Sequence, residues 1–452
     1  MIHKFQQGGR YILMDVNSGG VHLIDKLVYK ILDYYPDKGE AEIVEILSNE
    51  FTVSEVKEAL EEIHLLVQNG LLYKEDHYHQ HESFKNKKPV VKALCLHVSH
   101  DCNIRCKYCF ASQGDFKGQR TLMDSEIGKK AIDFLLTHSG NRRNLEVDFF
   151  GGEPLLNFEM VKEIVDYGRE REKEYGKNLR FTMTTNGVLL DDEKMDYINK
   201  NMHNVVLSID GREEVNDTMR YTVKGKGTYD VILPKLKKMA EIRNHEGYYV
   251  RGTFTSFNLD FSKDVLHLAD LGFKNISVEP VVAEANQDYA IKEEDLPTVF
   301  NHYEQLAEEY VKRKKEGRDF NFFHFMIDLN QGPCVIKRIV GCGAGAEYIA
   351  VTPEGDLYPC HQFVGNEDFK IGSVVTGELN RDMYHSFSEA HVYNKEKCTQ
   401  CWAKFYCSGG CHANAYNFNN DIMVPYDIGC EMEKKRVECA LYIQARLLEE
   451  ED

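Results

Sequence analysis

The chain has 452 residues, of which 42% are hydrophobic and 28% charged, as in ordinary globular proteins. Its net charge of −18 argues against a nucleic-acid partner, which requires a basic surface. No run of the sequence approaches the ~18 apolar residues that cross a bilayer, and the first residues lack the apolar core of a signal peptide. We therefore expect a cytoplasmic protein without a membrane partner. Thirteen cysteines in such a chain indicate metal binding or catalysis and not disulfides.

Residues 1–75 are predicted to form a small N-terminal domain. Strand-like runs at 10–15 and 20–24 predict a β-hairpin, and a further edge strand is expected at 71–73. Helices are expected at 26–34, 40–49 and 54–68. A hairpin on three helices has a winged-helix-like shape, but the acidic side chains on the third helix argue against phosphate contacts with DNA.

Residues 76–89 are polar and without pattern, which predicts a linker. Strands and helices then alternate over residues 90–318. The strands are expected at 93–98, 145–150, 179–184, 205–209, 250–255 and 275–278. The helices are expected at 125–137, 159–175, 191–200, 229–243, 263–271 and 294–315. This alternation predicts an α/β fold with a partial (β/α)6 barrel, whose functional loops lie at the carboxyl ends of the strands.

Three cysteines, Cys102, Cys106 and Cys109, follow the first predicted barrel strand. A [4Fe–4S] cluster normally takes four thiolates, so three from one loop leave one iron open. A zinc ion is the alternative, but zinc sites are usually built from cysteine pairs that close a four-ligand set. The spacing, with the aromatic Tyr108 before the third cysteine, resembles the signature of the radical S-adenosylmethionine (SAM) superfamily. In that family the amino and carboxylate groups of SAM chelate the open iron.

Polar motifs follow the next three predicted strands. Residues 150–154, Phe-Gly-Gly-Glu-Pro, resemble the family motif that holds the methionine amino group of SAM. Residues 184–187 and 208–211 resemble motifs that contact its ribose and carboxylate, although plain turn chemistry is an alternative for both. The resemblance implies SAM contacts from Tyr108, Phe110, Gly151, Gly152, Glu153, Thr184, Asn186, Ser208, Asp210 and Arg220.

Residues 319–452 carry most of the other cysteines and a final helix expected at 431–448. Seven of these cysteines follow an order that resembles the SPASM domain, which adds two auxiliary [4Fe–4S] clusters and brings the total to three. The resemblance implies that the outer cluster binds Cys398, Cys401, Cys407 and Cys430. It implies that the inner cluster binds Cys342, Cys360 and Cys411. A zinc ribbon over residues 398–411 is the alternative reading.

Three further cysteines remain outside these sets. Cys95 lies within a predicted strand and Cys439 on the last predicted helix, so both are expected to be buried packing residues. Cys334 stays ambiguous. It is either a fourth ligand of the inner cluster, or that cluster has an iron open to a substrate thiolate.

The three-part architecture resembles radical SAM peptide maturases, most closely the SCIFF (six cysteines in forty-five residues) maturases, which resemble the thioether-forming sactipeptide enzymes. In such enzymes an N-terminal element, here residues 1–75, binds the leader of a precursor peptide as an added strand. The resemblance implies that a 5′-deoxyadenosyl radical abstracts hydrogen from a cysteine-rich ribosomal peptide and that a Cys-to-Thr thioether forms. It also implies an electron donor of the flavodoxin or ferredoxin type.

Two other functions stay open at this stage. One is a sulfatase-type maturase that makes formylglycine. In that branch an acidic residue directly follows the cysteine corresponding to Cys360, but here the next residue is His361. His361 is a candidate proton acceptor, although a surface histidine is equally ordinary. The other is a non-enzymatic iron–sulfur adaptor that binds peptides. The sequence leaves open the crosslinked Thr carbon, the precursor sequence, the general base and the oligomeric state.

Overall fold

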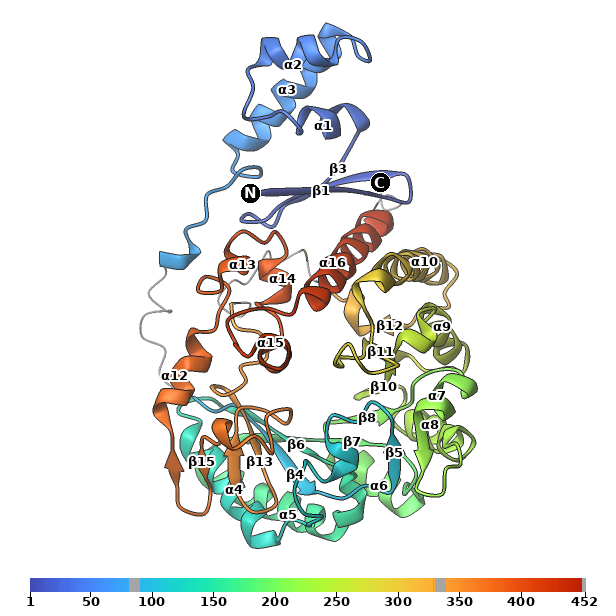
Figure 1. Cartoon of the computed structure of the whole chain (residues 1–452), viewed down its shortest axis with the longest axis vertical. Helices are drawn as coiled ribbons and strands as arrows, with labels where there is room; N and C mark the ends of the chain where they lie inside the picture. Colours follow the sequence, from blue (N-terminus) through green and yellow to red (C-terminus); the bar gives the residue numbers. More distant parts are fainter. Residues whose placement is uncertain (81–89, 328, 330–338, 449–452) are drawn as a thin grey trace.

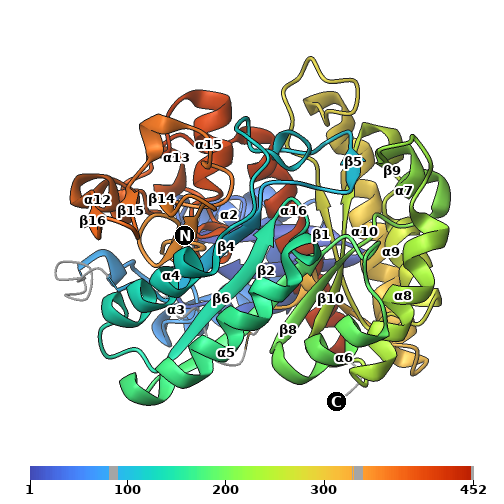
Figure 2. The ribbon, with the colours of Figure 1, turned by 90° about the horizontal axis from the view of Figure 1, so that it is seen from below.

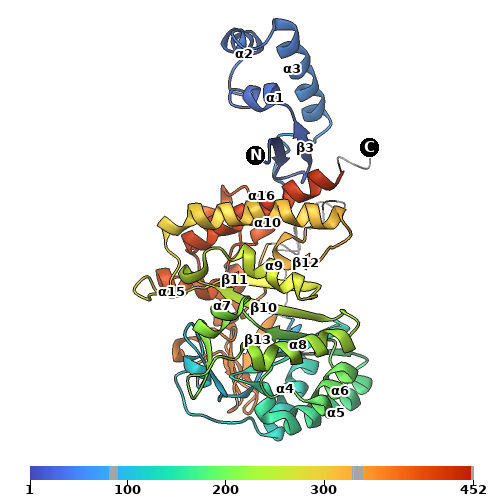
Figure 3. The same cartoon turned by 90° about the vertical axis from the view of Figure 1, so that its right-hand side faces the viewer.

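The computed structural model describes residues 1–80, 90–327, 329 and 339–448. The N-terminal unit lies at one end of the long axis and the alternating strands and helices lie at the other end (Figures 1 and 3). The cysteine-rich C-terminal part runs between them, so that its last helix lies beside the N-terminal strands.

The N-terminal unit is a three-stranded antiparallel sheet followed by three helices. Its strands are, in order, β1 (Ile2–Gln7), β2 (Arg10–Asp15) and β3 (Val21–Ile24). Its helices are α1 (Lys26–Ile31), α2 (Glu40–Leu47) and α3 (Val53–Gln68). β2 and β3 match the predicted hairpin, whereas β1 has no counterpart in the prediction. The expected strand at 71–73 is wrong, because the amides of Leu71 and Leu72 donate to the carbonyl of Leu66 and close the end of α3.

The partial barrel has the predicted parallel strands. They are β4 (Ala93–Ser99), β6 (Asn144–Gly151), β7 (Asn178–Thr185), β8 (Asn204–Ser208), β10 (Tyr248–Phe254) and β11 (Asn275–Pro280). Their helices are α4 (Ser125–His138), α5 (Phe158–Tyr175), α6 (Asp192–Asn201), α8 (Tyr229–Ile242), α9 (Ser262–Asp270) and α10 (Leu296–Lys315). The helices cover the outer face of the sheet (Figure 2). Side chains alternate along the strands, so that Phe181 and Met183 are buried while Thr182 and Thr184 lie on the partly open opposite face.

The sheet does not stop at the barrel. β13 (Tyr348–Val351) pairs in parallel with β4, with Ala350 opposite Cys95. The antiparallel strands β14 (Asp356–Tyr358), β15 (Gly372–Ser373) and β16 (Glu378–Leu379) then extend that edge, and the short β12 (Asn321–Phe322) lies at the other edge. The cysteine-rich region is therefore built directly onto the strand that leads into the first cysteine loop.

Helices complete the C-terminal part. They are α12 (Arg381–Glu389), α13 (Glu396–Thr399), α14 (Lys404–Cys407), α15 (His412–Asn419) and α16 (Asp427–Leu448). α16 packs along α10 and reaches the N-terminal sheet. Cys95 and Cys439 are both buried, as predicted, and the Cys439 thiol donates to Gln7 of β1. Among the described residues, no helix combines the length and apolar character that crossing a membrane requires.

The N-terminal unit is held to the C-terminal part by specific contacts. His3 stacks on Trp402 with ring centroids 3.6 Å apart, and its Nε2 lies 3.0 Å from Glu438 of α16. Asp76, in the predicted linker, accepts hydrogen bonds from Tyr393 and Lys404 at 2.9 Å each. The first residues of the linker are therefore fixed against the cysteine-rich part.

Candidate functional site

The predicted motifs converge on one cavity at the carboxyl end of the barrel strands. Cys102, Cys106 and Cys109 line it, and it encloses about 690 Å³ of empty space, counting the part open to solvent. Each predicted SAM contact except Asp210 also lines the cavity; these are Tyr108, Phe110, Gly151, Gly152, Glu153, Thr184, Asn186, Ser208 and Arg220.

The cysteine loop is held over the strand ends by short polar contacts. In the loop, β5 (Ile104–Cys106) pairs with β9 (Arg220–Thr222), which sets Cys106 opposite Arg220. The Asn186 side chain, at the end of β7, donates to Asn103 at 2.8 Å and lies 3.7 Å from the Cys102 sulfur. The positions of the thiols therefore depend on residues distant in sequence.

The glycine pair lets the cysteine loop approach the end of β6. A Cβ atom at Gly151 would lie 2.2 Å from the Ser99 carbonyl oxygen, and one at Gly152 would lie 2.1 Å from that of Asp101. Gly151 also has a φ of +126°, which disfavours any other residue. No side chain fits at either position, so the backbone itself forms this wall of the cavity.

Glu153 is fully buried behind this wall. Its carboxylate accepts hydrogen bonds from the Thr185 hydroxyl at 2.7 Å and from the amides of Asn186 and Leu155 at 2.8 and 3.1 Å. Burial raises the pKa of Glu153, and these bonds and the charge of Arg220 oppose that rise. A buried carboxylate at a cavity wall is stabilised further by a cationic ligand group such as an ammonium.

Asp210 lies behind the cavity and does not line it, unlike the other predicted contacts. The Tyr108 hydroxyl donates to its carboxylate, with the two oxygens 2.8 and 2.7 Å away, and the Thr253 amide donates to it at 3.0 Å. Arg220 in turn donates to the Tyr108 oxygen at 3.1 Å. Burial raises the pKa of Asp210 to about 6, against the opposing effect of Arg220 and Tyr108. Asp210 therefore positions Tyr108, which lies between two of the cysteines.

The donor set fits an iron–sulfur cluster with an amino-acid ligand. Burial raises the pKa of Cys102 to about 11 and that of Cys106 to about 12, so thiolates there require a cationic partner, which iron supplies. The buried Nε of Arg220 has no hydrogen-bond partner in the described structure, and Glu153 supplies the opposite charge. Among the described residues no group of three His, Cys, Asp or Glu side chains is placed to hold a single metal ion.

An aromatic cluster joins this cavity to the cysteine-rich part. Phe110 is 50% exposed, and its ring lies 5.4 Å from that of His361, which also lies 5.1 Å from Phe150. Burial lowers the pKa of His361 to about 4, so the imidazole is neutral at pH 7. The His361 side chain is partly exposed and packs against Phe110 and Phe150, next to Cys360 in the sequence.

A second cavity unites the four predicted ligands of the outer cluster, which are Cys398, Cys401, Cys407 and Cys430. They come from α13, α14, the turn between them and α16. Burial raises the pKa of Cys407 to about 12 and that of Cys430 to about 11. The same chemical argument applies as in the first cavity, since these thiolates require a cationic partner.

The three predicted ligands of the inner cluster also lie close to one another. Burial raises the pKa of Cys360, and the nearby thiols of Cys411 and Cys342 raise it further. Cys411 lies on the loop that follows the outer ligand Cys407. Cys334, the candidate fourth ligand, lies outside the described residues.

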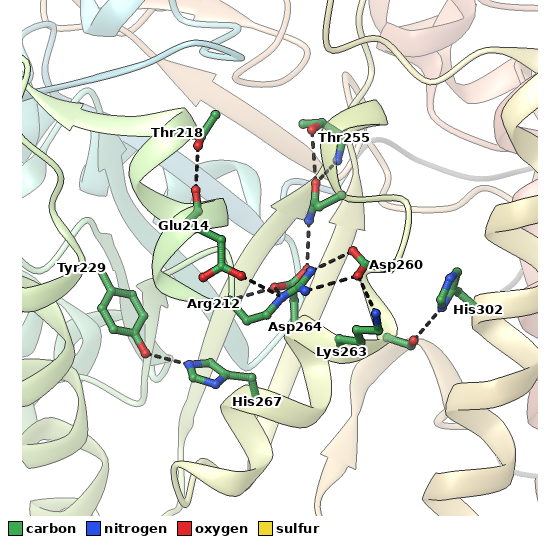
Figure 4. Close-up of polar contacts among 12 residues, drawn as sticks. Arg212, Glu214, Thr218, Tyr229, Thr255, Asp260, Lys263, Asp264, His267 and His302 are labelled. Carbon is green, nitrogen blue, oxygen red and sulfur yellow. Dashed lines mark hydrogen bonds and ion pairs between the residues drawn. The ribbon is translucent and has the colours of Figure 1, made fainter.

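An ion-pair cluster beside the site has no sequence motif and is absent from the prediction. Arg212 follows Asp210 and Gly211 in the loop after β8 and binds Asp260 and Asp264 (Figure 4). Its Nε and Nη2 donate to the two oxygens of Asp264 at 2.8 and 3.2 Å. This cluster fixes the loop that carries Asp210.

Comparison with known proteins matches two family models to this chain. The model of the radical SAM superfamily matches residues 96–259, and that of an iron–sulfur cluster-binding domain, SPASM, matches residues 342–402. Fe-coproporphyrin III synthase of Methanosarcina barkeri is 31% identical over 394 residues, which cover 78% of this chain and 90% of that enzyme. A cysteine-type anaerobic sulfatase-maturating enzyme of Clostridium novyi is 23% identical over 72% of this chain and 88% of its own.

A solved structure extends the likeness to the N-terminal unit. The structure of Streptococcus suis SuiB bound to the precursor peptide SuiA has a TM-score of 0.53 and 16% identity. The match covers 95% of this chain and 98% of SuiB. At this identity the likeness concerns the fold alone. Because the match covers 95% of this chain, it must include most of residues 1–75.

Proposed function

The chain belongs to the radical SAM superfamily and carries a SPASM iron–sulfur cluster-binding domain, and on that premise we propose that it is a peptide maturase. It forms an intramolecular Cys-to-Thr thioether in a cysteine-rich ribosomal peptide. The observation that carries the proposal is the single cavity in which the cysteine triple, the Gly-Gly-Glu turn and Arg220 meet, on a sheet that continues into the SPASM domain.

In this proposal Cys102, Cys106 and Cys109 hold the [4Fe–4S] cluster that binds SAM. Glu153 binds the ammonium of SAM and Arg220 its carboxylate, because these are the opposite charges at the wall of the cavity. The SAM-bound cluster supplies a one-electron hydrogen abstraction, whose organic chemistry belongs to the cofactor. Tyr108 and Asp210 keep the cysteine loop in place, and Phe110 lies at the open side where an adenine can stack.

The peptide loses one S–H and one C–H hydrogen as an S–C bond forms, which is a two-electron oxidation. Hydrogen abstraction accounts for one electron, and a second acceptor is required for the other. The two auxiliary clusters that we assign to the SPASM cysteines are suited to this role, because they add electron-accepting groups to the part of the chain that continues the barrel sheet. A donor of the flavodoxin or ferredoxin type reduces the first cluster.

The N-terminal unit offers an edge for the leader of the precursor. β3 is the last strand of its sheet in the described structure, and an extended peptide adds to such an edge through main-chain hydrogen bonds. Leu23 on β3 is 44% exposed and offers an apolar contact for the peptide. The SuiB structure, which contains the precursor SuiA, supports this use of the unit.

Formylglycine formation is the second candidate, supported by the match to the sulfatase-maturating enzyme. It requires a base near the reacting cysteine, and the acidic residue expected after Cys360 is replaced here by His361. Neutral His361 can accept a proton, but it lies against Phe110 and Phe150. The thioether proposal does not depend on an acid at this position.

Anaerobic reaction of the reconstituted protein with SAM, a reductant and a cysteine-rich precursor peptide tests the proposal. Tandem mass spectrometry should show loss of two hydrogens and a Cys–Thr link, together with formation of 5′-deoxyadenosine. Replacement of a cysteine thiol by an aldehyde would instead establish formylglycine formation, and an unchanged peptide despite SAM cleavage would reject both. The Cys106→Ala variant should show neither SAM cleavage nor peptide change.

The leader site is tested separately by fluorescence anisotropy with a labelled leader peptide. Leu23→Glu should weaken binding, because a charge then faces the added strand. Val375→Glu is the matched control, since Val375 is 48% exposed but lies in the C-terminal part. Equal binding by the two variants would exclude the β3 edge.

A further inference from the structure

Lys395 is a fully buried lysine beside the outer cysteines, with no solvent exposure at all. Its ammonium donates to the carbonyl of Gly409 at 2.8 Å. An ammonium has three N–H donors, and in the described structure no carboxylate pairs with it. A buried cation without a counter-charge is costly, so an anionic partner is expected at this position.

The surroundings of Lys395 indicate what that partner is. Gly409 lines the outer cavity, whereas the next two residues, Gly410 and Cys411, line the neighbouring cavity. Cys407 and Cys430 line both, so they form the wall between the cavities. The Cys398 amide donates to the Lys395 carbonyl at 2.9 Å, and a Cβ atom at Gly409 would lie 3.8 Å from the Lys395 Nζ. Lys395 thus lies beside the outer ligand Cys398 and against the glycine turn that leads directly to the inner ligand Cys411.

The other lysines around the outer cavity are neutralised by the chain itself. Lys397 lies 2.6 Å from Asp427, Lys404 lies 2.9 Å from Asp76, and Lys434 lies 2.7 Å from Glu431. Lys395 differs from all of them in being both buried and unpaired with an acid in the described residues.

We propose that Lys395 is the shared counter-ion of the two auxiliary clusters and that its charge raises their reduction potentials. Reduction adds one negative charge to a cluster, and a fixed cation nearby stabilises the reduced form more than the oxidised form. Hydrogen bonds to the sulfurs and net charge are the usual determinants of such potentials. A raised potential makes the auxiliary clusters better acceptors of the second electron. This inference rests on the proposed assignment of two auxiliary clusters.

An EPR-monitored redox titration tests the inference without the peptide. The background variant Cys102→Ala/Cys106→Ala/Cys109→Ala removes the first cluster, and its iron and sulfide content tests the two-cluster assignment by itself. In that background, Lys395→Met should lower the midpoint potentials. The ratio of reduced to oxidised cluster at a fixed potential should fall by about tenfold, which is ~59 mV for a one-electron couple. Lys395→Arg keeps the charge and should stay close to the parent value.

Lys397→Met is the matched control, because this lysine adjoins Cys398 but is 56% exposed and paired with Asp427. Its effect on the potentials should be much smaller, since solvent screens the charge. Full iron content with unchanged potentials in Lys395→Met overturns the inference. If Lys395→Met loses iron, retention of both clusters in Lys395→Arg supports a requirement for charge. Loss of iron in both variants contradicts that requirement.

Discussion

The ion pairs of Arg212 lead to a quantitative prediction for the loop beside the SAM site (Figure 4). Asp264 is fully buried, and besides Arg212 it accepts a hydrogen bond from Asn258 at 3.0 Å. Arg212→Met removes the cation and leaves this carboxylate without a counter-charge. Removing one partner of a buried pair costs about 3–5 kcal/mol. Because the Arg212 side chain is 23% exposed and Asp260 is 30% exposed, we expect the lower end of that range.

Differential scanning calorimetry of the reconstituted protein measures this cost. For a unit of about 150–250 residues, 1 kcal/mol corresponds to ~2–4 °C in Tm, so the barrel transition should fall by about 6–12 °C. The double variant Arg212→Met/Asp264→Asn should recover part of the loss, because the unpaired charge is then removed. Arg251→Met is the matched control. That side chain is 53% exposed and 3.9 Å from Glu279, so its Tm should hardly change.

The same variant should also weaken SAM binding, because Arg212 holds the loop that carries Asp210. Gly211 shows how tightly this loop is packed, since a Cβ atom there would lie 2.3 Å from the Cβ of Asp264. A Tm within about 1 °C of wild type would refute the energetic reasoning, because it is far below the shift expected for a broken buried pair. A double variant less stable than Arg212→Met would refute it as well.

Three further predictions concern other parts of the molecule. Burial raises the pKa of Asp148 from 3.8 to about 7, and the charge of Glu146 adds a smaller effect. The stability that protonated Asp148 contributes to the fold is therefore fully present below pH 3.8 and is lost as the pH rises through about 7. Thermal scans across that window should show a flatter profile for Asp148→Asn, and an identical profile would contradict the shift. Tyr108→Phe removes the hydroxyl between Asp210 and Arg220, and calorimetric titration should show SAM binding about tenfold weaker, ~1.4 kcal/mol. Unchanged affinity would show that this hydroxyl does not position the site. Asp76→Asn leaves Lys404, whose side chain is 4% exposed, without its carboxylate, and calorimetry should show a lower Tm for the N-terminal and SPASM parts.

The barrel could be predicted from the sequence because its signals are local. Each strand is a short apolar run and each helix has its own apolar periodicity, so the order of elements appears directly in the chain. β13 could not be predicted in this way. Its four residues become a strand only through pairing with β4, which lies about 250 residues earlier in the chain. The same is true of β5, which has three residues and pairs with β9.

The candidate site likewise contains residues that the sequence identifies and residues that only the structure identifies. The cysteines and the Gly-Gly-Glu turn have fixed spacings, so the sequence alone identifies them. Lys395 gives no such signal, because it stands beside Glu396 and Lys397 in a charged stretch that is typical of a solvated surface. Its burial depends on the path of the loop through Gly409, which only the tertiary structure determines. Asp210 is the converse case, because the sequence motif identifies it but its side chain binds Tyr108 and does not line the cavity.

The contacts of the N-terminal unit connect the proposed leader site to the proposed outer cluster. Trp402, which stacks on His3, and Lys404, which pairs with Asp76, both line the cavity of the outer cysteines. α16 supplies Cys430 to that cavity and Glu438 to His3, so one helix serves both parts. The N-terminal sheet is therefore in direct contact with residues that surround the outer cysteines. If the proposed assignments hold, the residues that fix the N-terminal sheet are therefore the same residues that surround the proposed outer cluster.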